Sequence, residues 1–172
     1  MKGTTLLSGL LFALTAQATS VPKVTFEQLT DQSELIVSGE IARSWTAWDN
    51  SHHFIWTHYE LSIGSTYKGV ARPTIEFAEP GGVAGGLRQT IADTVQYGVG
   101  EKVFIFLERM PNGYLRTTGW SQGKYTLDAA GRVHAMASLA SSSRPIDGIS
   151  ASELSARVTA RIQQLKSTGV RQ

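Results

Sequence analysis

The sequence predicts a mainly β domain: a small closed barrel of five to seven strands, with a short helix before it and a longer helix after it. Apolar residues alternate with other residues along Phe54–Ile63, the pattern of a strand with one buried face. Val103–Glu108 is almost continuously apolar, as expected of a strand covered on both faces. Pro111-Asn112-Gly113 is a strong turn signal, so the residues after it should pair back as a hairpin.

Turn residues and hydrophobic periodicity give the order of the remaining elements. A barrel domain is expected over residues 19–136, a serine-rich linker over 137–149, and a C-terminal helix that packs on the barrel over 150–167. The expected strands are Glu34–Ile41, Phe54–Ile63, Thr74–Ala78, Val103–Glu108, Tyr114–Trp120, Lys124–Leu127 and Arg132–Ala135. Arg43–His53 and the glycine-rich Gly81–Gly86 are expected to be connections, the second a flexible loop. An OB-type Greek-key barrel is the most economical arrangement of these strands.

Capping motifs mark the expected starts of both helices. Thr25 is expected to cap the first helix, with Gln28 closing a capping box. Ser150 and Glu153 form the same motif in front of the C-terminal helix. That helix carries one apolar stripe, made of Leu154, Val158, Ile162 and Leu165.

The first 18 residues have the features of a cleavable secretory signal. Lys2 precedes the apolar run Leu6–Leu14, and Ala16-Gln17-Ala18 is an A-x-A cleavage site. The run is shorter than the roughly 20 apolar residues that a membrane-spanning helix needs. We therefore expect an exported protein that starts at Thr19 after cleavage, is not inserted in a membrane, and resides in the periplasm or outside the cell.

Composition narrows the class of protein further. The chain has no cysteine, whereas small secreted eukaryotic domains usually depend on disulfides, so a bacterial envelope or extracellular protein is favoured. It has 16 basic and 14 acidic residues and no run of lysines and arginines. The charge distribution therefore does not predict binding to nucleic acid.

Aromatic residues gather in one segment of the chain. Trp45, Trp48, Phe54 and Trp56, with His58, are expected on the face of the second strand opposite its aliphatic stripe. Exposed aromatic rings mark binding surfaces, because they bury a large area at little entropic cost. The alternative is that the C-terminal helix or a long connection covers these rings as part of the core.

One motif resembles a catalytic site. Gly119–Gly123 (GWSQG) matches the G-x-S-x-G nucleophile elbow, and Asp128 and His134 follow Ser121 in the order of an α/β-hydrolase triad. The elbow requires a strand followed by a helix, but the flanks here are strand-like on both sides. We therefore expect a glycine-flanked hairpin turn and no catalytic residue.

Two further patterns and one carboxylate are interpreted as surface features without a specific function. His52, His53 and His58 lack the convergent spacing of a zinc site, so no metal is expected. Gly81–Gly86 lacks the Gly-Lys-Ser/Thr of a phosphate-binding loop, so no cofactor is expected. Glu79 is expected to be a surface carboxylate.

Several short segments, taken in order, form a recognisable series. They are Val21-Pro22, Ser33–Ile41, a strand from Tyr59-Glu60 to Tyr67-Lys68-Gly69, Ile75 and Phe77 before Pro80, Glu101–Leu107, and the Asn112-Gly113 turn into Tyr114–Thr118. This series, which covers roughly Thr19–Trp120, resembles the netrin-like (NTR) module of tissue inhibitors of metalloproteinases, an OB-type barrel.

The resemblance implies a function for the N-terminus, but this chain also differs from those inhibitors. In those inhibitors a disulfide-tethered N-terminal cysteine chelates the zinc of the protease. Here the expected terminus is Thr19, whose amine and carbonyl could chelate but which has no covalent tether. Ordering an untethered terminus on binding costs affinity.

The sequence therefore favours an exported, non-enzymatic module that binds a protein or polymer through its aromatic strand face and adjoining loops. One alternative is an inhibitor or partner of a secreted metalloprotease that acts through Thr19. The other, which the sequence disfavours, is a serine hydrolase built on Ser121.

Overall fold

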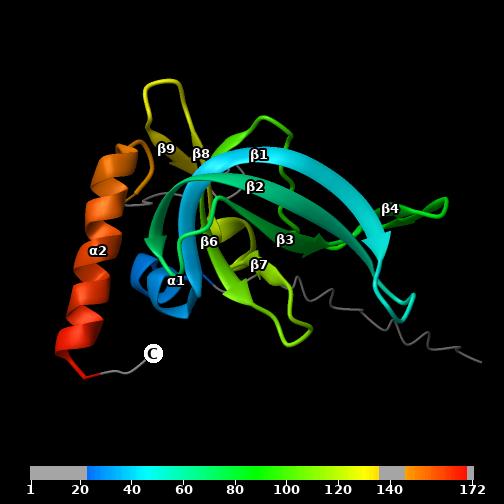
Figure 1. The fold of residues 1–172 in the computed structure, drawn as a ribbon, viewed down its shortest axis with the longest axis horizontal. Coiled ribbons are helices and arrows are strands. Elements are labelled where there is room, and N and C mark those ends of the chain that lie inside the picture. The colour runs from blue at the N-terminus through cyan, green and yellow to red at the C-terminus, as the bar shows by residue number, and fades with distance from the viewer. Residues whose placement is uncertain (1–22, 136–145, 170–172) are drawn as a thin grey trace, which may run out of the picture.

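The computed structural model describes residues 23–135 and 146–169, and these form mainly β structure (Figure 1). Within them, one antiparallel sheet has the strand order β3-β2-β1-β6-β8-β9, with β7 paired to β6, and β4 and β5 form a separate hairpin. The elements are α1 (Phe26–Gln32), β1 (Leu35–Trp48), β2 (Ile55–Lys68), β3 (Thr74–Pro80), β4 (Gly82–Ala84), β5 (Leu87–Gln89), β6 (Lys102–Arg109), β7 (Leu115–Thr117), the 3-10 turn η1 (Trp120–Gly123), β8 (Lys124–Leu127), β9 (Val133–Ala135) and α2 (Ala151–Ser167). The prediction of a mainly β domain with two helices is confirmed.

Both predicted helix starts are confirmed. The Thr25 hydroxyl accepts from the backbone N–H of Gln28, and the Gln28 side chain accepts from the backbone N–H of Thr25. At the start of α2 the Ser150 hydroxyl accepts from the backbone N–H of Glu153. Each bond satisfies an N–H that has no partner inside its helix, so each fixes the residue at which the helix begins.

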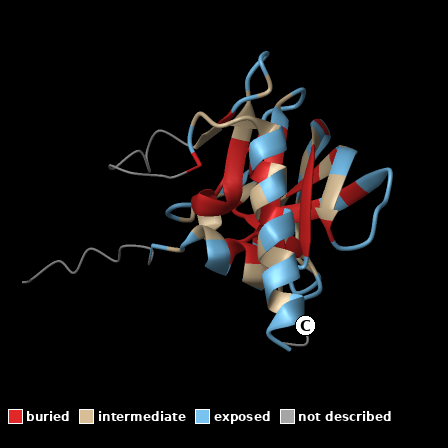
Figure 2. Ribbon diagram, turned by 90° about the vertical axis from the view of Figure 1, so that its left-hand side faces the viewer, coloured by how far each residue is buried: buried red, intermediate tan, exposed pale blue. Residues whose placement is uncertain are grey.

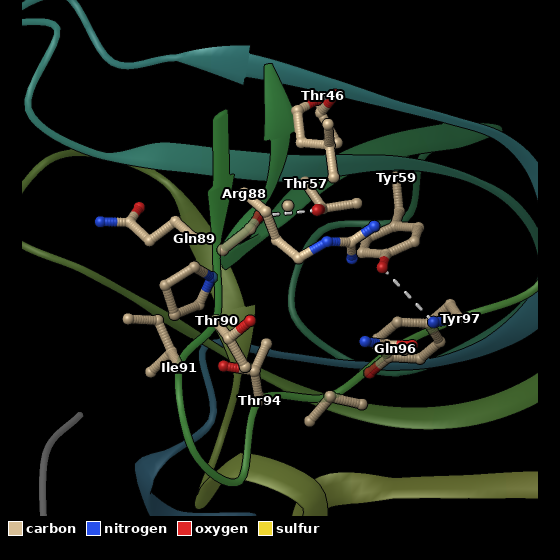
Figure 3. Close-up of a pocket in the computed structure, with 15 residues that line it drawn as sticks. Thr46, Thr57, Tyr59, Arg88, Gln89, Thr90, Ile91, Thr94, Gln96 and Tyr97 are labelled. Carbon is tan, nitrogen blue, oxygen red and sulfur yellow. Dashed lines mark hydrogen bonds between the residues drawn. The ribbon is translucent and has the colours of Figure 1, made fainter. Parts of the chain in front are cut away.

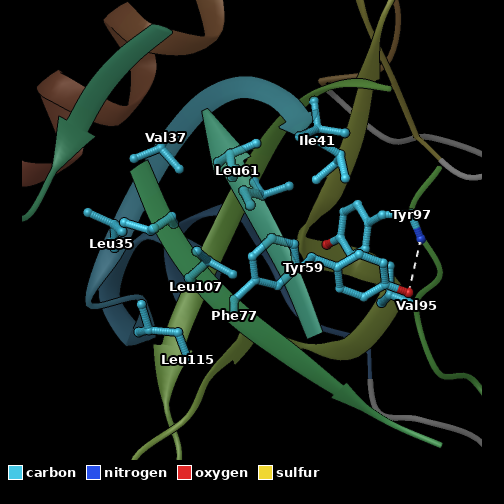
Figure 4. Close-up of a cluster of buried hydrophobic side chains, with 13 residues drawn as sticks. Leu35, Val37, Ile41, Tyr59, Leu61, Phe77, Val95, Tyr97, Leu107 and Leu115 are labelled. Carbon is cyan, nitrogen blue, oxygen red and sulfur yellow. Dashed lines mark hydrogen bonds between the residues drawn. The ribbon is translucent and has the colours of Figure 1, made fainter. Parts of the chain in front are cut away.

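Strand β6 separates two hydrophobic clusters, as its continuous apolar run predicts. Val103, Ile105 and Leu107 point to one side and Phe104 and Phe106 to the other, and all are fully buried. Cluster 1 (Figure 4) contains Leu35, Val37, Ile41, Tyr59, Leu61, Ile75, Phe77, Val95, Tyr97, Val103, Ile105, Leu107 and Leu115. It therefore gathers side chains from β1, β2, β3, β6 and β7 on one face of the sheet.

Cluster 2 lies between the other face of the sheet and the two helices. Its buried members are Leu29, Ile36, Phe104, Phe106, Tyr125, Val133, Ile146, Leu154 and Val158. Helix α2 buries one side in this cluster and leaves the other exposed (Figure 2). Arg161 joins α2 to α1 through a 2.6 Å ion pair with Asp31. Of the residues expected to form a linker, Ile146 is thus part of the core, and residues 137–145 lie outside the described part of the chain.

Over the two described ranges, no helix combines the length and apolar character needed to cross a membrane.

Two expectations about the connections are wrong. Strand β1 continues to Trp48 and β2 starts at Ile55, so only residues 49–54 separate two long strands. Residues 81–86, expected to be a flexible loop, contain β4 and the turn of the β4–β5 hairpin. The two segments, which are distant in sequence, are joined by a hydrogen bond from the Thr46 hydroxyl of β1 to the Val83 carbonyl of β4. A second bond joins the strands beside them, from the Ile55 N–H of β2 to the Gln89 side chain of β5.

Candidate binding site

The pairing of β1 with β2 produces a row of aromatic and charged side chains on one face of the ribbon. Arg43 lies opposite Glu60, Trp45 opposite His58, and Ala47 opposite Trp56. Directly opposed residues of an antiparallel pair project to the same side, so these side chains share a face. It is the face opposite cluster 1, to which Tyr59 and Leu61 belong.

Four rings on this face pack against one another, and we call Trp45, Trp56, His58 and Tyr114 the aromatic surface. The rings of Trp45 and His58 stack with centroids 5.3 Å apart and planes inclined by 9°. Tyr114 packs edge-on against Trp56 and His58, at 5.2 Å and 5.3 Å between centroids. These separations are typical of favourable aromatic pairs.

Tyr114 was not among the binding residues predicted from the sequence. It follows the Pro111–Gly113 turn between β6 and β7, and its backbone carbonyl accepts from the Met110 N–H. The turn therefore carries Tyr114 to the aromatic surface. The sequence indicates the turn, but the position of that turn beside β2 depends on the tertiary fold.

Charged side chains hold the rings in place. Nδ1 of His58 lies 2.9 Å from Oε1 of Glu76 on β3, and the His58 side chain is buried beneath its neighbours. The Arg43 guanidinium lies 4.5 Å from the centroid of Trp45 and forms a 3.0 Å ion pair with Glu60. A cation over an indole ring is attracted to it, so Arg43 orients Trp45 as well as pairing with Glu60.

The aromatic surface remains partly open to solvent. Trp45 and Trp56 are half-buried, and α2 packs on cluster 2 through Leu154 and Val158. The rings that contact Trp56 and His58 belong to the β6–β7 turn and to β1, so α2 does not bury them.

Two of the predicted residues are not among these packed rings. Trp48 is opposite Ile55, so it projects to the other face of the ribbon, where it stacks on His52 at 6.3 Å. Phe54 immediately precedes β2 and is 46% exposed. The expectation that all the aromatic residues of this segment share one face is therefore wrong for Trp48. Thr19 lies outside the described residues.

The residues of the GWSQG motif form a turn. Gly119 and Trp120 both have positive φ (64° and 58°), and residues 120–123 form η1 before β8. Ser121 is buried, whereas His134 is half-exposed on the β8–β9 hairpin with Nε2 2.9 Å from Oδ2 of Asp128. This hydrogen bond from His134 holds the pKa of Asp128 below its usual value.

Among the residues that the structure describes, no group of three or more His, Asp or Glu side chains is arranged to hold a metal ion.

Comparison with protein-family models, with curated proteins and with solved structures finds no match for this chain.

Proposed function

We propose that this chain is an exported, non-enzymatic module that binds a protein or polymer ligand through the aromatic surface. The observation that carries the proposal is the half-open group of Trp45, Trp56 and Tyr114 around the buried His58. These rings are already packed against one another and held by Arg43 and Glu76, so they lose little entropy when a ligand covers them, which is the property of binding hot spots.

We also propose that the sheet is an OB-type barrel of the kind found in NTR modules. The neighbours β3-β2-β1-β6-β7 run in the order of the five strands of such a barrel, and their side chains meet in cluster 1. The buried carboxyl group of Glu79 on β3 accepts a 2.8 Å bond from the Thr117 N–H of β7, which links the two ends of that series.

This interpretation favours the aromatic surface over other surfaces. OB-type barrels bind ligands on the face of their second and third strands, with help from the loops after the first and fourth strands. In this chain the corresponding elements are β2, β3, residues 49–54 and the β6–β7 turn. His58 and Trp56 come from β2, Glu76 from β3 and Tyr114 from the β6–β7 turn.

For the test, residues 19–172 are immobilised and incubated with envelope and extracellular fractions of a bacterium that produces this protein. A ligand retained by the wild type should be lost from Trp56→Ala, with a loss of about 2 kcal/mol or more, about 30-fold in Kd. Trp48→Ala is the matched control, because it removes a tryptophan from the opposite face. Equal loss from both variants would contradict the proposal.

A denaturant melt separates binding from folding in this experiment. Removing the edge-on pair between Trp56 and Tyr114 should lower the free energy of unfolding by about 1 kcal/mol. A loss of about 3–5 kcal/mol would instead identify Trp56 as a core residue. Inhibition of a zinc protease that disappears when one residue is added before Thr19 would favour the alternative function.

A further inference from the structure

A second candidate site lies on the other face of the β1–β2 ribbon (Figure 3). A cavity of about 350 Å³ separates the ends of β1 and β2 from the segment that carries β4, β5 and residues 90–97. Thr46, Thr57 and Tyr59 line it from the ribbon, and their side chains project away from the aromatic surface. The cavity is therefore independent of the aromatic surface.

The walls of this cavity are held by internal hydrogen bonds. The Thr57 hydroxyl donates to the Gly81 carbonyl at 2.7 Å, and the Tyr59 hydroxyl accepts from the Tyr97 N–H at 3.4 Å. Gly82 permits the close approach of this segment, because a Cβ there would lie 2.7 Å from Oγ1 of Thr57. A cavity with such walls is formed before any ligand arrives.

Two polar side chains at the cavity lack a hydrogen-bond or ion-pair partner among the described residues. Oγ1 of Thr94 is buried, and within the described ranges it has no hydrogen-bond partner. The Arg88 guanidinium is the only charged group among the lining residues, and in the described part of the chain no carboxylate pairs with it. In Figure 3 the Arg88 side chain extends from β5 toward Tyr59. The Thr94 hydroxyl is the unusual one of the two, because buried polar groups without partners are rare in proteins and call for an explanation. Arg88 is exposed, so its guanidinium is accessible to a ligand that enters from solvent.

We propose that this cavity binds a small organic monocarboxylate. A guanidinium presents paired N–H donors that match the two oxygens of a carboxylate, and the Thr94 hydroxyl can donate to the same group. Pro80, Ile91 and Val95 supply apolar wall for the rest of the ligand. A cation is excluded because no acidic residue lines the cavity. The lining carries a single guanidinium, which balances the charge of a monocarboxylate but not that of a phosphate dianion.

The probes are sodium benzoate and sodium butyrate, with benzamide as an uncharged analogue of benzoate. Each is titrated into ¹⁵N-labelled residues 19–172 while the amide resonances are followed. Benzoate, butyrate or both should shift the resonances of residues 82–97 saturably, and benzamide should bind at least about tenfold more weakly than benzoate. The absence of saturable shifts there with both carboxylates would overturn the proposal, as would saturable binding of benzamide that is as tight as that of benzoate.

Variants assign the binding to the two unpartnered groups. Arg88→Gln should weaken carboxylate binding about tenfold or more, and Thr94→Val should weaken it by a smaller factor. Arg72→Gln is the matched control, since Arg72 is exposed and does not line the cavity. Undiminished binding in a folded Arg88→Gln protein would overturn the proposal. Trp56→Ala should leave carboxylate binding unchanged, because the Trp56 side chain lies on the opposite face of the ribbon. A negative result for the cavity can therefore be distinguished from a negative result for the aromatic surface.

Discussion

The backbone N–H of Thr117 on β7 donates a 2.8 Å hydrogen bond to Oε1 of Glu79, a carboxyl group on β3 that solvent does not reach. The other oxygen, Oε2, has no partner among the described residues. Burial raises the pKa of Glu79 to about 7, although the bonds from Thr117 and the charge of Arg116 oppose that rise and the charge of Glu108 adds to it. The carboxyl group thus connects two strands that share no backbone ladder in the described sheet.

We predict that Glu79 makes the protein less stable as the pH rises. The folded pKa lies above that of the unfolded chain, so the folded state binds more protons between about pH 4.5 and pH 7. Stability from this group is therefore present below pH 4.5 and is lost as the pH rises to 7, by on the order of 3 kcal/mol. Glu79→Gln, which mimics the protonated carboxyl group, should remove that loss in urea melts at pH 5 and pH 8.

The control for this measurement is Glu40→Gln, which changes an exposed carboxylate on β1. It should keep the difference between the wild-type free energies of unfolding at the two pH values. If Glu79→Gln also keeps that difference, the carboxyl group is charged in the folded protein at both pH values and the prediction is wrong.

Local signals in the sequence were sufficient for several elements. The Thr25 and Gln28 pair marks the start of α1, and Ser150 marks the start of α2, because a capping side chain bonds within three residues of itself. The apolar run of β6 also identifies a strand covered on both faces, since alternate side chains must all find apolar partners.

Other features depend on partners far away in the sequence. The extension of β1 to Trp48 follows from pairs such as Trp45 with His58, which no local pattern reveals. The same applies to Tyr114, which joins the aromatic surface only because the β6–β7 turn lies beside β2. Glu79 was expected at the surface, as is usual for a carboxylate. Its position opposite Thr57, on the side of cluster 1, became evident only from the register of β2 with β3.

We predict that Ser121 is not a nucleophile. Its side chain is buried in a turn, and the imidazole of His134 is bonded to Asp128 on a half-exposed hairpin. A fluorophosphonate probe should therefore leave residues 19–172 unlabelled, as judged by intact mass. Ser121→Ala should retain the wild-type melting curve to within about 1 kcal/mol. A probe adduct mapped to Ser121 would establish the hydrolase alternative.

We predict that export removes residues 1–18. The apolar run Leu6–Leu14 followed by the small residues Ala16 and Ala18 is the pattern that signal peptidase cleaves. Mass spectrometry of the protein recovered from the periplasm or the medium should give Thr19 as the first residue. Asp in place of Ala18 should block processing, because the site accepts only small residues. A chain that retains Met1 after export would contradict the prediction.

The last prediction compares two glycines in the β1–β2 pair. A Cβ on Gly39 would lie 2.1 Å from the Ser62 carbonyl oxygen, whereas a Cβ on Gly64 would meet its nearest atom, the Ser38 carbonyl oxygen, at 3.6 Å. Neither has a positive φ, so the contact alone distinguishes them. Gly39→Ala must displace backbone and should lower the free energy of unfolding by about 3 kcal/mol or more. Gly64→Ala should stay within about 0.5 kcal/mol of the wild type or gain slightly. Urea melts measure both values, and equal values would mean that β1 and β2 separate at Gly39 without cost.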